Sequence, residues 1–143
     1  MAKQVYYEDV EVGYKIPSLV KHPTTEQLVR WAGAVGDYYP IHYDKDFAQS
    51  LGLPGVIVHG QLVACFLGQL VTDWVGEKGT VTRLTVTYRR TMYPGEDIIC
   101  QGEVAKKYVK DGNHYVECNV SAENLKGEKS VTGAAIVILP ARE

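Results

Sequence analysis

The chain has few of the residues that mark secretion, metal binding or contact with nucleic acid. Its 143 residues include only three cysteines, which are widely separated, with no CxxC pair and no His/Cys cluster. This spacing favours reduced thiols in a cytoplasmic protein and indicates no metal site. Lys and Arg number 15 against 17 Asp and Glu. The resulting net charge of −2 indicates no affinity for nucleic acid or for an anionic membrane.

Long hydrophobic runs are missing as well. The longest apolar stretch, residues 62–75, contains glycine and polar residues and is too short to cross a bilayer. The N-terminal residues are polar and acidic and do not resemble a secretory signal. The length and the ordinary globular composition predict one domain over residues 1–143.

The first half of the chain predicts helices. Residues 14–22 are typical of an edge strand because they contain Pro17. A helix should follow from an N-cap at Thr24 or Thr25 and end at Gly36, and a short helix is expected at 44–51. From Gly60 the sequence GQLVACFLGQLVTDWV is apolar nearly all round, which predicts a buried central helix.

The second half predicts strands, because it is rich in Val, Ile, Thr and Tyr. Pro94-Gly95, Asp111-Gly112 and Lys126-Gly127 separate its segments and predict three successive hairpins. The predicted strands are residues 80–90, 97–109, 113–124 and 129–139. The expected architecture is therefore α+β, with a long central helix wrapped by a curved antiparallel sheet.

The loop GDYYPIHYD carries the first candidate site. Asp37 and His42 lie five residues apart just past a helix end, and Pro40 between them forbids a helical path. A turn can therefore fold both side chains toward one cleft. A carboxylate beside an imidazole is a workable proton-transfer pair, because the carboxylate orients the ring and raises its basicity. The alternative is that the pair only satisfies hydrogen bonds of the loop.

The second candidate site lies at the start of the central helix. Gly60 has no side chain, so a ligand can approach backbone N–H groups that lack intrahelical acceptors. These donors and the positive end of the helix dipole can hold an oxyanion. The alternative is that Gly60 only eases packing and that His59 caps the helix. Together the two segments supply an acid/base pair and an oxyanion donor, which proton transfer α to a thioester carbonyl requires.

At this spacing the segment GDYYPIHYDKDFAQSLGLPGVIVHGQL resembles the hydratase 2 motif of MaoC-like (R)-specific enoyl thioester hydratases and dehydratases. The following segment VTDWVGEKGTVTRLTVTYRRTMYPGED is similar to the catalytic dehydratase subunit (3-hydroxyacyl-ACP dehydratase) of mycobacterial fatty-acid elongation. The resemblance covers essentially the whole chain. The matching motif positions are Asp37, Pro40, His42, Asp44, His59 and Gly60.

The resemblance implies a hot-dog fold and a hydro-lyase that acts on acyl-CoA or acyl-carrier-protein thioesters without a metal or other cofactor. It implies that Asp37 and His42 hold or activate the water and that the Gly60 amide binds the thioester oxygen. It also implies a homodimer or a heterodimer with a related hot-dog subunit. Acyl chain length and pathway stay open.

The chain departs from the family pattern at Tyr39, where the family commonly has Asn. Tyr39, His59 and Cys65 are candidates for the substrate pocket, although a cysteine in the central helix is expected to be a buried apolar filler. Five basic residues are candidates for contact with phosphates of coenzyme A or an acyl-carrier group: Arg83, Arg89, Arg90, Lys106 and Lys107. The alternative is that they are solvated charges on the outer face of the sheet.

Two other functions stay open. A thioesterase would need an acid from the central helix, where residues 61–75 offer only Asp73, near the far end. A non-catalytic acyl-binding subunit of a heterodimer would be expected to lack the Asp and His of the loop, and both are present. Substitution of either residue should distinguish catalysis from binding.

Overall fold

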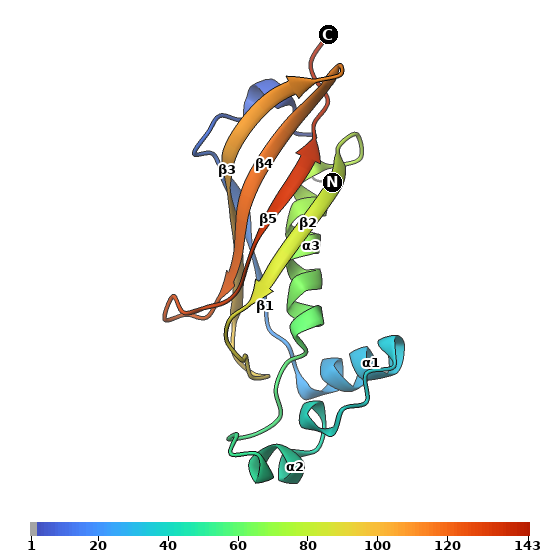
Figure 1. The fold of residues 1–143 in the computed structure, drawn as a ribbon, viewed down its shortest axis with the longest axis vertical. Coiled ribbons are helices and arrows are strands. Elements are labelled where there is room, and N and C mark those ends of the chain that lie inside the picture. The colour runs from blue at the N-terminus through green and yellow to red at the C-terminus, as the bar shows by residue number, and fades with distance from the viewer. Residues whose placement is uncertain (1–2) are drawn as a thin grey trace.

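The computed structural model describes residues 3–143. A five-stranded antiparallel sheet curves around one long helix (Figure 1). Four shorter helices lie at the ends of this assembly. In chain order the elements are η1 (Tyr7–Asp9), β1 (Lys15–Lys21), α1 (Thr25–Val35), η2 (Pro40–His42), α2 (Lys45–Ser50), α3 (Gly60–Val75), β2 (Thr80–Tyr88), β3 (Ile98–Lys110), β4 (Asn113–Glu123) and β5 (Lys129–Ile138).

The strand order in the sheet is β1-β3-β4-β5-β2. Two of the three predicted hairpins are confirmed: β3 pairs with β4 around Asp111 and Gly112, and β4 pairs with β5 around Gly127. Both residues of the first turn have positive φ angles, 50° and 77°, as an Asp-Gly hairpin turn requires. β1 is an edge strand with a register shift next to Pro17, as the proline predicted.

The prediction of a third hairpin, around Pro94-Gly95, is wrong. β2 pairs with β5 instead of β3, and residues 89–97 carry the chain across to β3 on the other side of the sheet. Backbone hydrogen bonds hold this crossing: Val58 donates to the carbonyl of Met92 at 2.8 Å, and Gly95 donates to that of Pro23 at 2.8 Å. A Pro-Gly pair favours a change of direction but does not select the strand that pairs next.

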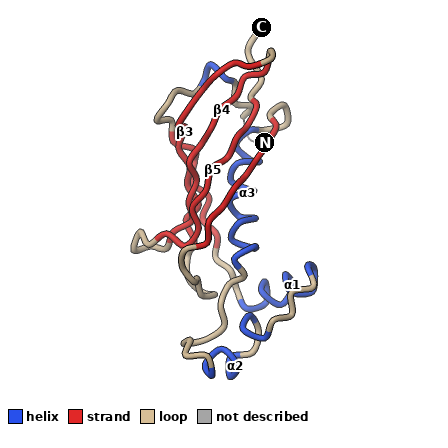
Figure 2. Tube along the Cα trace, in the orientation of Figure 1, coloured by secondary structure: helices blue, strands red, loops and turns tan. Residues whose placement is uncertain are grey.

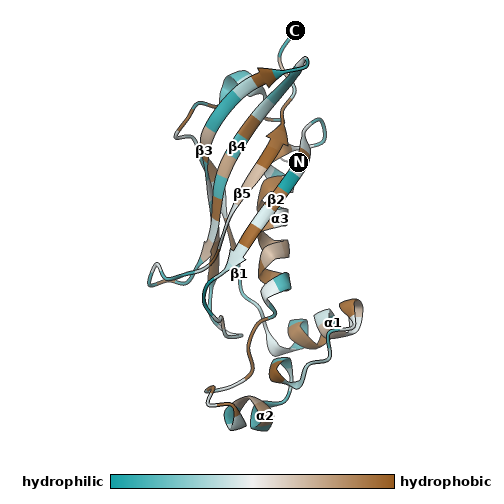
Figure 3. Cartoon of the chain, viewed as in Figure 1, coloured by the Kyte–Doolittle hydropathy of each residue, from teal (hydrophilic) through white to brown (hydrophobic). Residues whose placement is uncertain are grey.

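α3 packs one face against the sheet and supplies much of the core (Figure 3). Its buried side chains are Leu62, Val63, Phe66, Leu67, Leu70, Val71, Trp74 and Val75. The expectation of a helix buried all round is wrong, because a single-layer sheet covers only one side of it. Cys65 is exposed and is therefore no buried filler. In residues 3–143 no helix has the length and apolar character needed to cross a membrane.

Residues 25–59, here called the overhanging segment, lie beyond the N-terminal end of α3 and away from the sheet (Figures 1 and 2). Local signals shape this segment, and both ends of α1 are as predicted. Thr24 caps α1 by accepting a hydrogen bond from the Gln27 amide at 3.2 Å, and Gly36 ends it with a φ of 74°. Asp44 caps α2 by accepting from the Phe47 amide at 3.0 Å. The turn between the helices holds the candidate acid/base pair.

Candidate active site

Three side chains from separate parts of the chain meet at the N-terminal end of α3. Asp37 follows the glycine that ends α1, His42 ends η2, and His59 directly precedes α3. One polar atom of each lies within 4.8 Å of the other two. The turn through Pro40 thus brings Asp37 and His42 together, and the loop to α3 adds the third group.

The orientation of His42 follows from its hydrogen bond. Its Nδ1 lies 2.9 Å from the carbonyl oxygen of Ile57. A carbonyl only accepts, so Nδ1 carries the hydrogen, and the lone pair of the neutral ring is on Nε2. Nε2 lies 3.8 Å from Oδ2 of Asp37. Ile57 could not be identified from the sequence, because its contribution is a backbone carbonyl.

A backbone amide of the same turn binds the Asp37 carboxylate. Its Oδ1 accepts a hydrogen bond from the Tyr39 amide at 3.4 Å, and its other oxygen is directed toward His42. The Asp37 side chain is 39% exposed and that of His42 only 11%. The separation of 3.8 Å is longer than a direct hydrogen bond, so both groups can bond to one molecule of the size of water between them. The pair faces solvent on the Asp37 side.

His59 is almost completely buried, with 1% exposure, and its ring stacks on that of His42. The ring centroids lie 3.7 Å apart and the planes differ by 17°. Burial, followed by the neighbouring His42, lowers the pKa of His59, while the Asp37 backbone and carboxylate oppose this shift. The Asp37 backbone lies close to this ring, but neither ring nitrogen makes a hydrogen bond of good geometry within residues 3–143, and the side chain does not cap α3.

The geometry of this cluster favours proton transfer over metal binding. Asp37, His42 and His59 could each offer one ligand atom. However, Nδ1 of His42 already donates to Ile57, and the two imidazole planes are nearly parallel. Metal coordination requires lone pairs that converge on one point. The lone pairs of two parallel rings, each lying in the plane of its ring, do not converge in this way.

Gly60 lies beside this cluster as the first residue of α3, so its amide has no acceptor within the helix. The Tyr88 ring covers it: a Cβ atom on Gly60 would lie 2.9 Å from Cε1 of Tyr88. The same two residues line a cavity of about 300 Å³ together with Arg89 and Arg90. Tyr88 was missed by sequence reasoning, since strand periodicity does not reveal what the end of β2 touches.

The other sequence candidates lie around the cluster or outside it. The Tyr39 ring meets that of His42 edge-on, with centroids 6.4 Å apart, and is half exposed. Cys65 lies more than one turn along α3 from Gly60, on the exposed side, and is not brought to the cluster. Arg89 donates to the hydroxyl of Thr132, and Arg90 pairs with Glu128.

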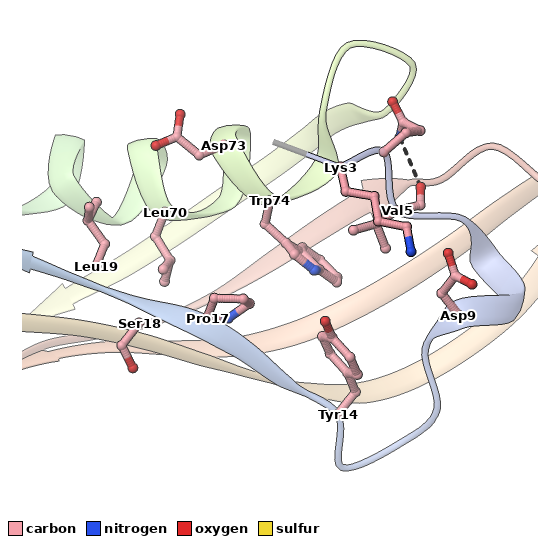
Figure 4. A pocket seen from close by; sticks show the side chains of 11 residues that line it. Lys3, Val5, Asp9, Tyr14, Pro17, Ser18, Leu19, Leu70, Asp73 and Trp74 are labelled. Atoms are coloured by element: carbon pink, nitrogen blue, oxygen red, sulfur yellow. Dashed lines mark hydrogen bonds between the residues drawn. The ribbon is translucent and has the colours of Figure 1, made fainter. Parts of the chain in front are cut away.

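A larger cavity of about 590 Å³ lies near the opposite end of α3. Figure 4 shows Trp74 and Leu70 directed toward Tyr14 and Leu19 across it. None of the three clustered side chains lines this cavity. A site needs reactive groups as well as space, and the acid, the imidazole and the free helix amide are all at the N-terminal end.

This combination of a curved antiparallel sheet and one long helix defines a hot-dog fold, and the acid–imidazole pair lies at the start of its helix. The sequence pattern of the family described as "MaoC like domain" matches residues 9–125. The chain belongs to this family.

Among its relatives is the (R)-specific enoyl-CoA hydratase of Aeromonas caviae, 25% identical over 134 residues, which cover 93% of this chain and 98% of that protein. The 3-hydroxybutyryl-CoA dehydratase of Methylorubrum extorquens is 26% identical over 140 residues, covering 97% of this chain and 87% of that protein. The unliganded R-hydratase PhaJ1 of Pseudomonas aeruginosa has the same fold, with a TM-score of 0.87, 24% identity and coverage of 97% and 88% of the two chains.

Proposed function

We propose that the protein is a hydro-lyase that interconverts trans-2-enoyl thioesters and (R)-3-hydroxyacyl thioesters. The hydratase and dehydratase relatives support this reaction, since they match nearly the whole chain. The observation that carries the proposal is the orientation of His42. With Nδ1–H bonded to Ile57, the lone pair on Nε2 is directed toward the Asp37 carboxylate, beside the first amide of α3.

In the hydration direction a water molecule bonds to both Nε2 of His42 and Oδ2 of Asp37. Nε2 accepts a proton from the water as its oxygen attacks the β carbon. Negative charge then develops on the thioester oxygen, where the Gly60 amide and the N-terminal end of α3 stabilise it. The acid–base pair returns the proton to the α carbon. Hydrogen and hydroxyl are thereby added across the double bond, and the enzyme is unchanged.

The test follows the loss of enoyl thioester absorbance when purified protein is mixed with crotonyl-CoA. We expect turnover by the wild type and a loss of about 10²- to 10⁴-fold for His42→Ala. His22→Ala is the matched control, because His22 is an exposed imidazole paired with Asp97 outside the site. If crotonyl-CoA and a longer-chain and a dicarboxylic enoyl thioester all remain unconsumed by folded protein, the proposed reaction is wrong.

The geometry argues against the thioesterase alternative. Asp73 lies 13 residues after Gly60 in α3, about 20 Å along the axis at ~1.5 Å per residue, and lines the opposite cavity. It is therefore far from the oxyanion donor that hydrolysis would also need. Release of free thiol from an acyl-CoA without loss of a double bond would favour the thioesterase. Binding of the thioester with no turnover would favour a non-catalytic subunit.

We also propose that the functional unit is a dimer, formed with an identical or a related subunit. β2 lies at a sheet edge, where unpaired backbone groups are available to a second strand. Apart from Asp73 near its C-terminal end, α3 exposes uncharged side chains: Gln61, Cys65, Gln69 and Thr72. Light scattering should give twice the chain mass, and Cys65→Arg should lower it, while Val109→Arg on the distant end of β3 should not. If the wild-type protein stays monomeric at all concentrations, it forms no homodimer. Either a related partner subunit is then required, or the functional unit is a monomer.

The substrate carrier is proposed to be coenzyme A or an acyl-carrier prosthetic group. Arg89 and Arg90 line the cavity at Gly60 and supply positive charge near the place where the thioester would bind. Comparing crotonyl-CoA with the same acyl group on a carrier protein tests which of the two is used.

A further inference from the structure

The contact between the two stacked imidazoles is not explained by the proposed reaction. His59 makes no hydrogen bond of good geometry within residues 3–143, and burial of an imidazole without partners is unfavourable. A leucine or phenylalanine would fill the same position without this cost. The imidazole is nevertheless the closest aromatic neighbour that the structure gives His42, at 3.7 Å between centroids. A buried polar group of this kind needs a reason.

The orientation of His42 is incompletely fixed without His59. The hydrogen bond from Nδ1 to Ile57 fixes one ring atom, at 2.9 Å, but the ring can still tilt about the line through that atom. Tyr39 meets the ring only at its edge, 6.4 Å between centroids. The flat contact with His59, whose planes differ by 17°, opposes the tilt.

We infer that His59 is a positioning residue for the proposed reaction: its stacked ring fixes the plane of His42 and keeps Nε2 directed at the space beside the Asp37 carboxylate. The dense packing around His59 at the start of α3 makes it a rigid support, since its side chain is 1% exposed. Its lowered pKa is consistent with this role, because an uncharged ring does not repel the proton that His42 takes up. An error of about 1 Å in the position of a catalytic group can cost ~10²-fold in rate.

A pair of variants separates stacking from the other properties of His59. His59→Phe keeps a flat ring but removes both nitrogens, and His59→Leu removes the ring while keeping an apolar side chain. If stacking is the function, kcat for crotonyl-CoA should fall about 10- to 100-fold in the Leu variant and by less than about fivefold in the Phe variant. KM should change little in either, because the contact is with His42 and not with the substrate.

Two kinetic outcomes would overturn the inference. Equal, large losses in both variants would mean that the ring nitrogens matter and not the stack. Wild-type kcat in both would mean that the contact has only a structural role. Thermal unfolding of each variant shows whether a lower rate reflects loss of folded protein.

A second measurement needs no turnover, so it tests the inference even if the proposed reaction is wrong. ¹⁵N NMR of the histidine rings should show His42 as a single tautomer with the hydrogen on Nδ1. In the Leu variant a tilting ring weakens its bond to the Ile57 carbonyl, so the two ring nitrogens should move toward averaged shifts. In the Phe variant they should not. A mixture of tautomers in the folded wild type would show that His42 is not fixed and would overturn the inference directly.

Discussion

The overhanging segment and the body of the molecule, formed by α3 and the sheet, differ in how far their apolar side chains are buried. Most of the buried hydrophobic side chains belong to the body, where Leu67, Val104 and Val137 are fully or almost fully buried. The overhanging segment instead exposes many of its large apolar side chains. These are Val29, Val35, Tyr38, Tyr39, Tyr43 and Leu51.

The candidate site lies where these two regions meet. The overhanging segment provides Asp37 and His42, and the body provides the Gly60 amide at the start of α3. Under the proposed function the two regions have different roles: the body supplies stability and the proposed oxyanion donor, while the segment supplies the groups proposed to exchange protons. Substitutions in the two regions should therefore have separable effects on stability and on turnover.

Asp37→Asn should give the largest effect on turnover with the least effect on the fold. The amide keeps the shape of the side chain but cannot carry the negative charge beside Nε2 of His42. We expect kcat to fall about 10²- to 10⁴-fold, measured with crotonyl-CoA. Asp46→Asn, an exposed acid in the first turn of α2, is the matched control and should keep wild-type turnover. Unchanged turnover in the Asp37 variant would contradict the assignment of the acid/base pair.

Leu67→Ala should show the opposite behaviour, with a large loss of stability. Leu67 is completely buried between α3 and the sheet, so its truncation leaves a cavity and should cost about 2–5 kcal/mol of unfolding free energy. Leu51→Ala in the overhanging segment removes a side chain that is 53% exposed and should cost less than ~0.5 kcal/mol. Urea unfolding measures both. Similar losses in the two variants would mean that Leu51 is buried in a dimer.

Two glycines of α3 allow a narrower comparison. A Cβ on Gly60 would lie 2.9 Å from the Tyr88 ring, whereas one on Gly68 would lie at an ordinary 3.8 Å from Leu84. Gly60→Ala must therefore displace Tyr88 next to the oxyanion donor, and we expect kcat to fall roughly tenfold. Gly68→Ala should keep its turnover and gain up to about 1 kcal/mol of stability, because alanine favours the helix.

If Gly60→Ala has wild-type kinetics, Tyr88 can move without disturbing the site, and the Gly60 amide is not closely approached by the substrate. Steady-state kinetics with crotonyl-CoA and urea unfolding of the two variants decide between these outcomes.

Features that depend on neighbouring residues could be predicted from the sequence. Thr24, Gly36 and Asp44 set helix ends through their own backbone contacts, and the turn that pairs Asp37 with His42 spans only five residues. The Asp-Gly turn likewise predicted its hairpin, because both residues carry the backbone angles that this turn needs.

Contacts between distant parts of the chain could not be predicted. The pairing of β2 with β5 is decided by how the sheet closes over α3, and Pro94-Gly95 contains no information about it. The stack of His59 on His42 and the contact of Tyr88 with Gly60 join residues that share no local pattern. The exposure of Cys65 also depends on how far a single sheet layer covers the helix, which apolar composition alone does not tell.

The smallest expected effect concerns acid stability at the boundary between the two regions. The pKa of His59 is lowered from 6.5 in the folded protein, mainly by burial. As the pH falls below 6.5, the unfolded chain binds a proton at His59 that the folded chain does not bind. Unfolding free energy should therefore fall with pH in this range, by at most about 1.4 kcal/mol per pH unit for this one proton.

His59→Phe should reduce this acid dependence, because the unfolded variant has no proton to gain at that position. Asp37 and His42, the titratable groups nearest to the ring, remain in place, so the difference between the two pH profiles reports the proton at His59 together with its coupling to these two groups. Urea unfolding from pH ~7.5 down to ~5 measures both proteins across the titration range of histidine. Parallel profiles for the wild type and the Phe variant would mean that folded His59 takes up its proton as readily as the unfolded chain does. The buried stack would then have to open or rearrange in acid, and the boundary between the two regions would be less rigid than its packing indicates.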